Sequence, residues 1–284
     1  MNNLFKNNSG NHNNSNNGSY SRIIAFFIFV LGLVGIYYLY QYLYGPKTGN
    51  AYSLITAITS AEVDKTKPIL IASDKLPLLY EGGEFTLSTW IYVNTWSYKS
   101  GQNKPIIFIG GSEFDTIRIY LGGYKPTLNV RLDTKSASVV ATSMTGNTQS
   151  NSLPVATKGS MFDGPAPQNG ALDSSSMCDL PEVGLQRWVQ IVVAVNGKTV
   201  DVYMDGKLAR SCVMPSFFRV DNQYSATLLA YGGFGGQIAN AQMYDAALNP
   251  EAIYKMYMAG PEPINSIADL FSSIFSFGVT INKK

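Results

Sequence analysis

The stretch that decides the fold is Trp188–Val213, which reads WVQIVVAVNGKTVDVYMDGKLARSCV. The dipeptides Asn196-Gly197 and Asp205-Gly206 divide it into three runs in which apolar residues recur at alternate positions. Asn-Gly and Asp-Gly between such runs are the strongest short-range signal for β-hairpins. The stretch therefore predicts a three-stranded antiparallel meander.

Further short apolar runs lie on both sides of the meander. In DTIRIYLGG, Ile117, Ile119 and Leu121 fall on one face of a strand, whereas Arg118 and Tyr120 fall on the other. We expect further strands at 85–93, 105–111, 128–132, 226–233 and 236–244. Short strands at this spacing predict a mainly β protein, an antiparallel jelly-roll sandwich.

One helix is predicted near the end of this body. Asn249 is suited to cap its N-terminus, Pro250 to occupy its first position, and Gly260 to end it. We place the folded body at 77–260, with a long polar insertion at 133–181 that is rich in Ser, Thr, Asn, Gly and Pro. Loops of this length are usually functional or disordered.

A second helix is predicted at Ile23–Tyr44, which contains no charged residue. Twenty-two helical residues span about 33 Å, enough to cross the hydrocarbon core of a bilayer. The tyrosines at its C-terminal end are typical of a membrane–water interface. We therefore interpret it as a transmembrane anchor; a cleaved signal peptide and a buried core helix are the alternatives.

The remaining segments are appendages in this interpretation. Residues 1–22 form an Asn-rich disordered tail, residues 45–76 a linker or stalk, and residues 261–284 an amphipathic C-terminal tail. The apolar face of that tail has three alternative roles: packing on the protein's own sheet, docking to a partner, or contact with the membrane interface. The positive charges on the two sides of the anchor are nearly equal in number. We expect a cytosolic N-terminus with the body on the opposite side, and this orientation rests also on the two cysteines discussed below.

Composition excludes several classes of function. His12 is the only histidine, so residues 13–284 offer neither imidazole for acid–base or nucleophilic catalysis nor a histidine metal ligand. Residues 48–284 carry 18 basic and 19 acidic side chains. A nearly neutral body lacks the basic surface that nucleic-acid binding requires, so we expect no nucleic-acid partner.

The body resembles the laminin-G/concanavalin-A-like superfamily of jelly-roll domains. Three stretches carry the resemblance: Gly83–Ile91, which is similar to the opening strand with its inward Trp90; Gln186–Leu208, with its YxDGK turn; and Gly233–Glu251. A narrower likeness, based on Cys178 before the meander and Cys212 after it, is to membrane-anchored virion proteins of large DNA viruses.

The two cysteines lie 34 positions apart. An even number of cysteines behind a membrane anchor favours a Cys178–Cys212 disulfide in an oxidising compartment, and two buried free thiols are the alternative.

The resemblance implies a fold but does not fix a function. Family members bind glycans, proteins or calcium, and those that cleave glucans carry an E-x-D-x-x-E strand that this sequence lacks. We therefore expect no enzyme and no cofactor. Ala239 and Asn240 stand where many members of the family have an acidic pair, so we expect no calcium site. The remaining weak candidates for calcium ligands are Asp115 and Asp133.

Two aromatic residues, Trp96 and Tyr98, follow a predicted strand end beside Lys99 and Lys104. At a loop rim they would stack on a sugar ring or fill a partner's pocket, and packing within the loop is the alternative.

The sequence thus favours a single-pass structural protein, a minor capsid–membrane component of a virion that binds capsid or other virion proteins. The alternative is a glycan- or receptor-binding ectodomain used in adhesion or entry. A virion membrane is the expected location.

Overall fold

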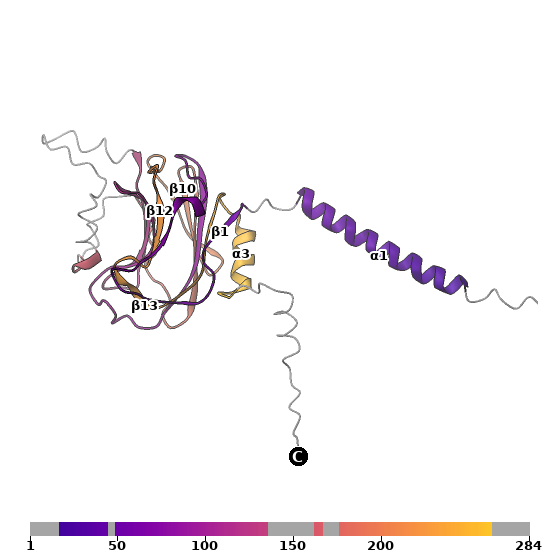
Figure 1. Ribbon diagram of the computed structural model, residues 1–284, viewed down its shortest axis with the longest axis horizontal. Coiled ribbons are helices and arrows are strands. Elements are labelled where there is room, and N and C mark those ends of the chain that lie inside the picture. The colour runs from indigo at the N-terminus through magenta and orange to yellow at the C-terminus, as the bar shows by residue number, and fades with distance from the viewer. Residues whose placement is uncertain (1–16, 45–48, 136–161, 167–175, 263–284) are drawn as a thin grey trace, which may run out of the picture. The chain divides into compact units, whose positions relative to one another are not determined.

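The structure, a computed structural model, describes residues 17–44, 49–135, 162–166 and 176–262 (Figure 1). The chain forms two units, Met1–Lys47 and Thr48–Lys284. The prediction of an apolar N-terminal helix followed by a mainly β, antiparallel two-sheet body is confirmed.

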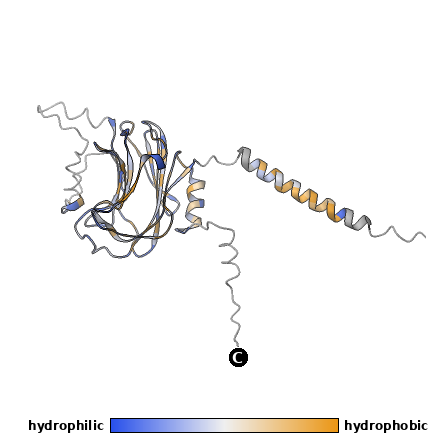
Figure 2. Ribbon diagram, in the orientation of Figure 1, coloured by the Kyte–Doolittle hydropathy of each residue, from blue (hydrophilic) through white to orange (hydrophobic). Residues whose placement is uncertain are grey.

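The first unit contains helix α1, Asn17–Tyr44, which begins six residues earlier than predicted. Its segment Arg22–Tyr40 is long and apolar enough to cross a membrane, and no other helix of the described ranges is. Within the first unit the side chains of that segment are exposed, and most of them are hydrophobic (Figure 2). By length and composition, this helix could be a membrane anchor or a signal sequence.

The second unit is a sandwich of two antiparallel sheets. Among the described residues, the larger sheet has seven strands, in the order β1-β13-β4-β9-β10-β11, with β2 also paired to β13. Its strands are β1 (Ala51–Ile55), β2 (Thr59–Glu62), β4 (Glu84–Val93), β9 (Trp188–Asn196), β10 (Thr199–Met204), β11 (Lys207–Val213) and β13 (Gly233–Tyr244). The predicted meander is thus confirmed as β9-β10-β11.

The smaller sheet has six strands in the described ranges, in the order β3-β12-β5-β6-β7-β8. These strands are β3 (Ile69–Ile71), β5 (Lys104–Gly110), β6 (Asp115–Leu121), β7 (Leu128–Leu132), β8 (Ser176–Met177) and β12 (Ser225–Leu228). The alternation predicted in β6 is confirmed, because Ile117, Ile119 and Leu121 belong to the core between the sheets. Tyr120 belongs to a separate apolar cluster outside that core.

The outer face of the larger sheet is covered by α3, Pro250–Ala259. As predicted, Asn249 caps this helix, with its side-chain oxygen accepting a hydrogen bond from the Ala252 N–H at 2.8 Å. Trp90 is buried here, and its ring stacks on Tyr257 at a centroid distance of 5.7 Å. The expectation that Trp90 is a buried core residue is confirmed, and its ring lies beneath α3.

The domain begins earlier than the predicted boundary at residue 77. Strands β1, β2 and β3 lie within the supposed 45–76 stalk, and they pair with β13 and β12. The alternation in these strands is short, three to five residues in each, which is why sequence periodicity did not reveal them.

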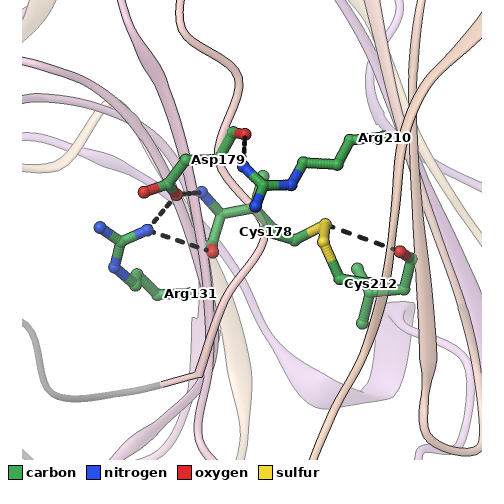
Figure 3. The surroundings of a disulfide bond; sticks show 7 residues. Arg131, Cys178, Asp179, Arg210 and Cys212 are labelled. Atoms are coloured by element: carbon green, nitrogen blue, oxygen red, sulfur yellow. Dashed lines mark hydrogen bonds and ion pairs between the residues drawn. A yellow bond between two sulfur atoms is a disulfide. The ribbon is translucent and has the colours of Figure 1, made fainter.

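The predicted disulfide between Cys178 and Cys212 is present, with the two Cα atoms 5.9 Å apart (Figure 3). Cys212 lies in β11, the edge strand of the larger sheet, and Cys178 follows β8, the edge strand of the smaller one. Asp179 adds polar links beside the disulfide: its carboxylate pairs with Arg131, and its carbonyl accepts a hydrogen bond from Arg210 at 2.7 Å. The two sheets are therefore joined at this edge.

Parts of the predicted appendages lie outside the described residues. These are 1–16 of the Asn-rich tail, 136–161 and 167–175 of the insertion, and 263–284 of the C-terminal tail, including its amphipathic face.

Candidate binding site

The two aromatic residues singled out in the sequence are held within their loop. The Trp96 ring is half-buried against the core, and the Tyr98 hydroxyl donates a hydrogen bond to the Gly232 carbonyl at 3.0 Å. Neither stands out as an exposed stacking platform, so the geometry matches the loop-packing alternative.

Two lysines organise the same loop. The Lys104 side chain is fully buried, and its ammonium donates hydrogen bonds to the carbonyls of Lys99, Gln102 and Gly123 at 3.2, 3.3 and 3.5 Å. It also lies 4.2 Å from the centroid of the Trp96 ring. The Lys99 ammonium donates to the Tyr231 carbonyl at 2.6 Å.

Burial lowers the pKa of both lysines to about 8, because a low-dielectric environment disfavours the charged form. The neighbouring Lys65 lowers the pKa of Lys99 further, and Lys99 does the same for Lys104. Lys104 thus places one positive charge inside a ring of carbonyl oxygens.

The two candidate metal ligands do not come together with other ligands. Asp115 and Asp133 are buried, and each lies near an arginine: Arg118 at 3.7 Å and Arg219 at 3.4 Å. In the described part of the chain, no group of three or more His, Cys, Asp or Glu side chains could hold a metal ion. The arginines instead supply the positive charge at both carboxylates.

A cavity of about 240 Å³ lies on the outer side of the smaller sheet. Strands β5, β6 and β12 contribute Phe108, Asp115 and Thr227, while Lys65 and Tyr231 come from a loop and a turn beside them. The volume is somewhat below the roughly 300–1,000 Å³ of pockets for drug-sized ligands, which limits an occupant to about one sugar ring in size.

The turn that carries Tyr231 is strained. Leu229 and Tyr231 both have left-handed backbone conformations, with φ of 56° and 53°. Each such residue costs about 1–3 kcal/mol and persists only where the surroundings enforce it, often at ligand sites. Burial raises the pKa of Tyr231, as do Asp115 and Asp163, so its hydroxyl remains a hydrogen-bond donor at neutral pH.

Part of the polar insertion is fastened beside this cavity. Phe162 is fully buried, with its ring centroid 5.0 Å from that of Phe108, 5.2 Å from Tyr120 and 5.6 Å from Tyr231. Asp163 pairs with Lys65 at 2.9 Å. The insertion thus makes two kinds of contact beside the cavity. The Phe162 ring packs against the lining residues Phe108 and Tyr231, and Asp163 pairs with the lining residue Lys65.

Sequence reasoning missed Lys65, Phe108, Phe162 and Tyr231. One signal was available for Phe162, which is the only aromatic residue in the 133–181 insertion. The others come from separate strands and turns that only the fold brings together.

The arrangement offers chemistry suited to a polyol. Asp115 can accept hydrogen bonds, Lys65 can donate them, and Ser225 and Thr227 can do both. The aromatic faces can cover an apolar ring face.

No protein-family model matches the chain, and no curated protein matches it either. Three solved structures with some similarity are the binding domains of botulinum neurotoxins. Serotype G has a TM-score of 0.42 at 10% identity, over 64% of this chain and 38% of that one.

The binding domain of neurotoxin DC in complex with SialylT gives 0.42 at 10% identity, over 76% and 48% of the two chains. The mosaic serotype C/D domain gives 0.45 at 10%, over 74% and 46%. The present chain thus spans less than half of each neighbour. Likeness at this level concerns the β-rich fold alone.

Proposed function

We propose that this protein is a single-pass membrane-anchored interaction protein whose sandwich, a jelly roll of the laminin-G/concanavalin-A-like type, binds neighbouring proteins. The observation that carries the proposal is α1, whose segment Arg22–Tyr40 is long and apolar enough to cross a membrane. A bilayer supplies the apolar environment that such a segment favours.

The proposed setting is the membrane of a virion, with capsid or other virion proteins as partners. The narrower resemblance around Cys178 and Cys212 supports this setting. Mass spectrometry of purified, membrane-containing particles tests it: the protein should be present at a constant ratio to the capsid protein. Its absence from such particles would refute the virion role.

The proposed orientation places the N-terminus in the cytosol and the sandwich on the opposite side. The disulfide supports it, since disulfides persist in oxidising compartments. Protease treatment of intact vesicles, followed by gels with and without reductant, tests this orientation. A protected, disulfide-bonded sandwich is expected, and a protease-exposed sandwich with free thiols would contradict it.

A non-catalytic role is part of the same proposal. It is supported by the lack of histidine beyond His12 and of the carboxylate pattern used for glucan cleavage. Turnover of a β-glucan by the purified full chain would overturn it.

A second candidate function, binding of a glycan or a glycosylated receptor, is favoured by the cavity beside Tyr231. A glycan array probed with the full chain in detergent tests it. Tyr231→Phe and Thr227→Val each remove one cavity hydroxyl and should weaken binding, whereas Tyr124→Phe, on an exposed loop, should not. Binding that is unchanged in both cavity variants would exclude this site.

A further inference from the structure

One end of the sandwich lies next to the point where the chain arrives from α1. The Asn50 N–H and side-chain amide donate hydrogen bonds to the two carboxylate oxygens of Asp245, at 2.7 and 2.8 Å. Just beyond Asp245, the Ala247 N–H donates to Glu84 at 3.4 Å. The start of β1, the end of β13 and the start of β4 therefore meet at this end.

The turn before β4 and the β9–β10 hairpin belong to the same end. The Gly197 N–H donates to the Gly83 carbonyl at 3.1 Å, and Glu84 pairs in register with Asn196. The Phe217 ring lies directly over Gly82, where a Cβ atom would come within 3.2 Å of it. We call this end of the sandwich the Asn50 end, after the residue at which the chain enters it. It includes the loops Leu78–Gly83, Asn196–Lys198 and Met214–Phe217.

The Asn50 end exposes large apolar side chains. The exposed fractions are 82% for Leu78, 63% for Tyr80 and 43% for Phe217. The Lys198 ammonium lies 5.1 Å from the centroid of the Phe217 ring, and Lys135 pairs with Glu81. Exposed apolar and aromatic residues beside long lysine side chains are typical of surfaces that contact a membrane interface.

Chain length fixes how far this end can lie from the bilayer. Six residue steps separate Tyr44, the end of α1, from Asn50. Fully extended, they span at most about 20 Å. If α1 crosses the membrane, the Asn50 end is the part of the sandwich that is tethered within that distance of the headgroups.

We propose that the Asn50 end rests on the surface of the bilayer that α1 crosses, with Leu78, Tyr80 and Phe217 in the interfacial layer. This inference rests on the proposed anchor. Its consequence is that the opposite end of the sandwich, where Tyr124 is exposed, faces away from the membrane and is open to partners.

The test places an environment-sensitive fluorophore on single introduced cysteines of the full chain in phosphatidylcholine vesicles. The positions are Leu78→Cys, Tyr124→Cys as the matched control at the opposite end, and Leu33→Cys as the reference within α1. Quenching is measured with a spin-labelled phosphatidylcholine and with aqueous iodide. We expect loss of fluorescence from the lipid quencher at residues 78 and 33 but not at 124.

Each other outcome overturns the inference in a recognisable way. Lipid quenching at residue 33 but not at 78 would leave the anchor intact and refute docking. A residue 78 label shielded from iodide but not reached by the lipid quencher would show that protein, such as a second copy, covers this end. No lipid quenching at residue 33 would refute the anchor itself. Adding Tyr80→Ser should reduce quenching at 78, whereas Tyr124→Ser should not.

Discussion

Among single residues, Lys104 has the most demanding environment. Its ammonium is buried, yet it supplies hydrogen bonds to three backbone carbonyls that come from two loops. An unpaired buried polar group costs about 1–3 kcal/mol. Lys104 therefore stabilises the loop that carries Trp96 and Tyr98.

We predict that Lys104→Met lowers the free energy of unfolding by about 1–3 kcal/mol, because methionine keeps an unbranched apolar stem but leaves the carbonyls without a donor. Denaturant titration measures the change, and hydrogen exchange should quicken in residues 97–103. Lys67→Met, at an exposed position, is the control and should have little effect. Equal stability of the two variants would contradict this role.

Lys99 should react as an unusually nucleophilic amine. Its pKa of about 8 lies below the value of about 10.4 for an unfolded chain. Acylation monitored by mass spectrometry should therefore reach half its maximal rate near pH 8 at Lys99 in the folded protein. In the denatured chain, the rate at Lys99 should still be rising above about pH 9. Parallel pH profiles for the folded and denatured chains would show that burial does not depress the Lys99 pKa.

The same pKa fixes the sign of a stability effect. Between pH 8 and about 10.4 the folded state binds fewer protons at Lys99 than the unfolded state does. The contribution of Lys99 to stability therefore increases as the pH rises through this window, and Lys99→Gln should remove that increase.

Among the elements, the edge strands β8 and β11 depend most on the Cys178–Cys212 disulfide. β8 has two residues, and the side chains of β11 are mostly exposed. The disulfide next to them closes a loop with a sequence separation of 34, which corresponds to about 3–4 kcal/mol of stabilisation in the chain-entropy account.

We predict that the double variant Cys178→Ser, Cys212→Ser loses about 3–4 kcal/mol of unfolding free energy. Reductant should destabilise the parent protein similarly and leave the double variant unchanged. Hydrogen exchange should localise the loosening to β8 and β11. A parent protein whose unfolding is insensitive to reductant would contradict the role of the disulfide.

At the scale of the whole molecule, short sequence signals predicted which strands and helices form, but they did not predict what those elements pack against. Asn196-Gly197 and Asp205-Gly206 specified the meander, and Asn249 with Pro250 specified the start of α3, because these signals act within a few residues. Trp90 was expected to be buried and is, but its packing against Tyr257 of α3 was not foreseen, since alternation reveals two faces of a strand and not which of them a helix will cover.

The candidate binding site was largely hidden from sequence reasoning for a related reason. Phe108, Phe162 and Tyr231 are far apart in the chain, and they meet only because the insertion is fastened to the smaller sheet. Trp96 and Tyr98 suggested a site by their neighbours in sequence, but Lys104 and Gly232 hold them inside their own loop.

The central claim is that α1 holds this sandwich in a membrane, and alkaline extraction of membranes from expressing cells tests it most directly. The full chain, with its N-terminal residues intact by mass spectrometry, should stay in the membrane pellet. The variant Leu31→Arg, Val34→Arg should be released, because each central arginine costs about 2.5–3.5 kcal/mol of insertion free energy. Release of the full chain, or a pelleted chain that begins after Tyr44, would contradict the account.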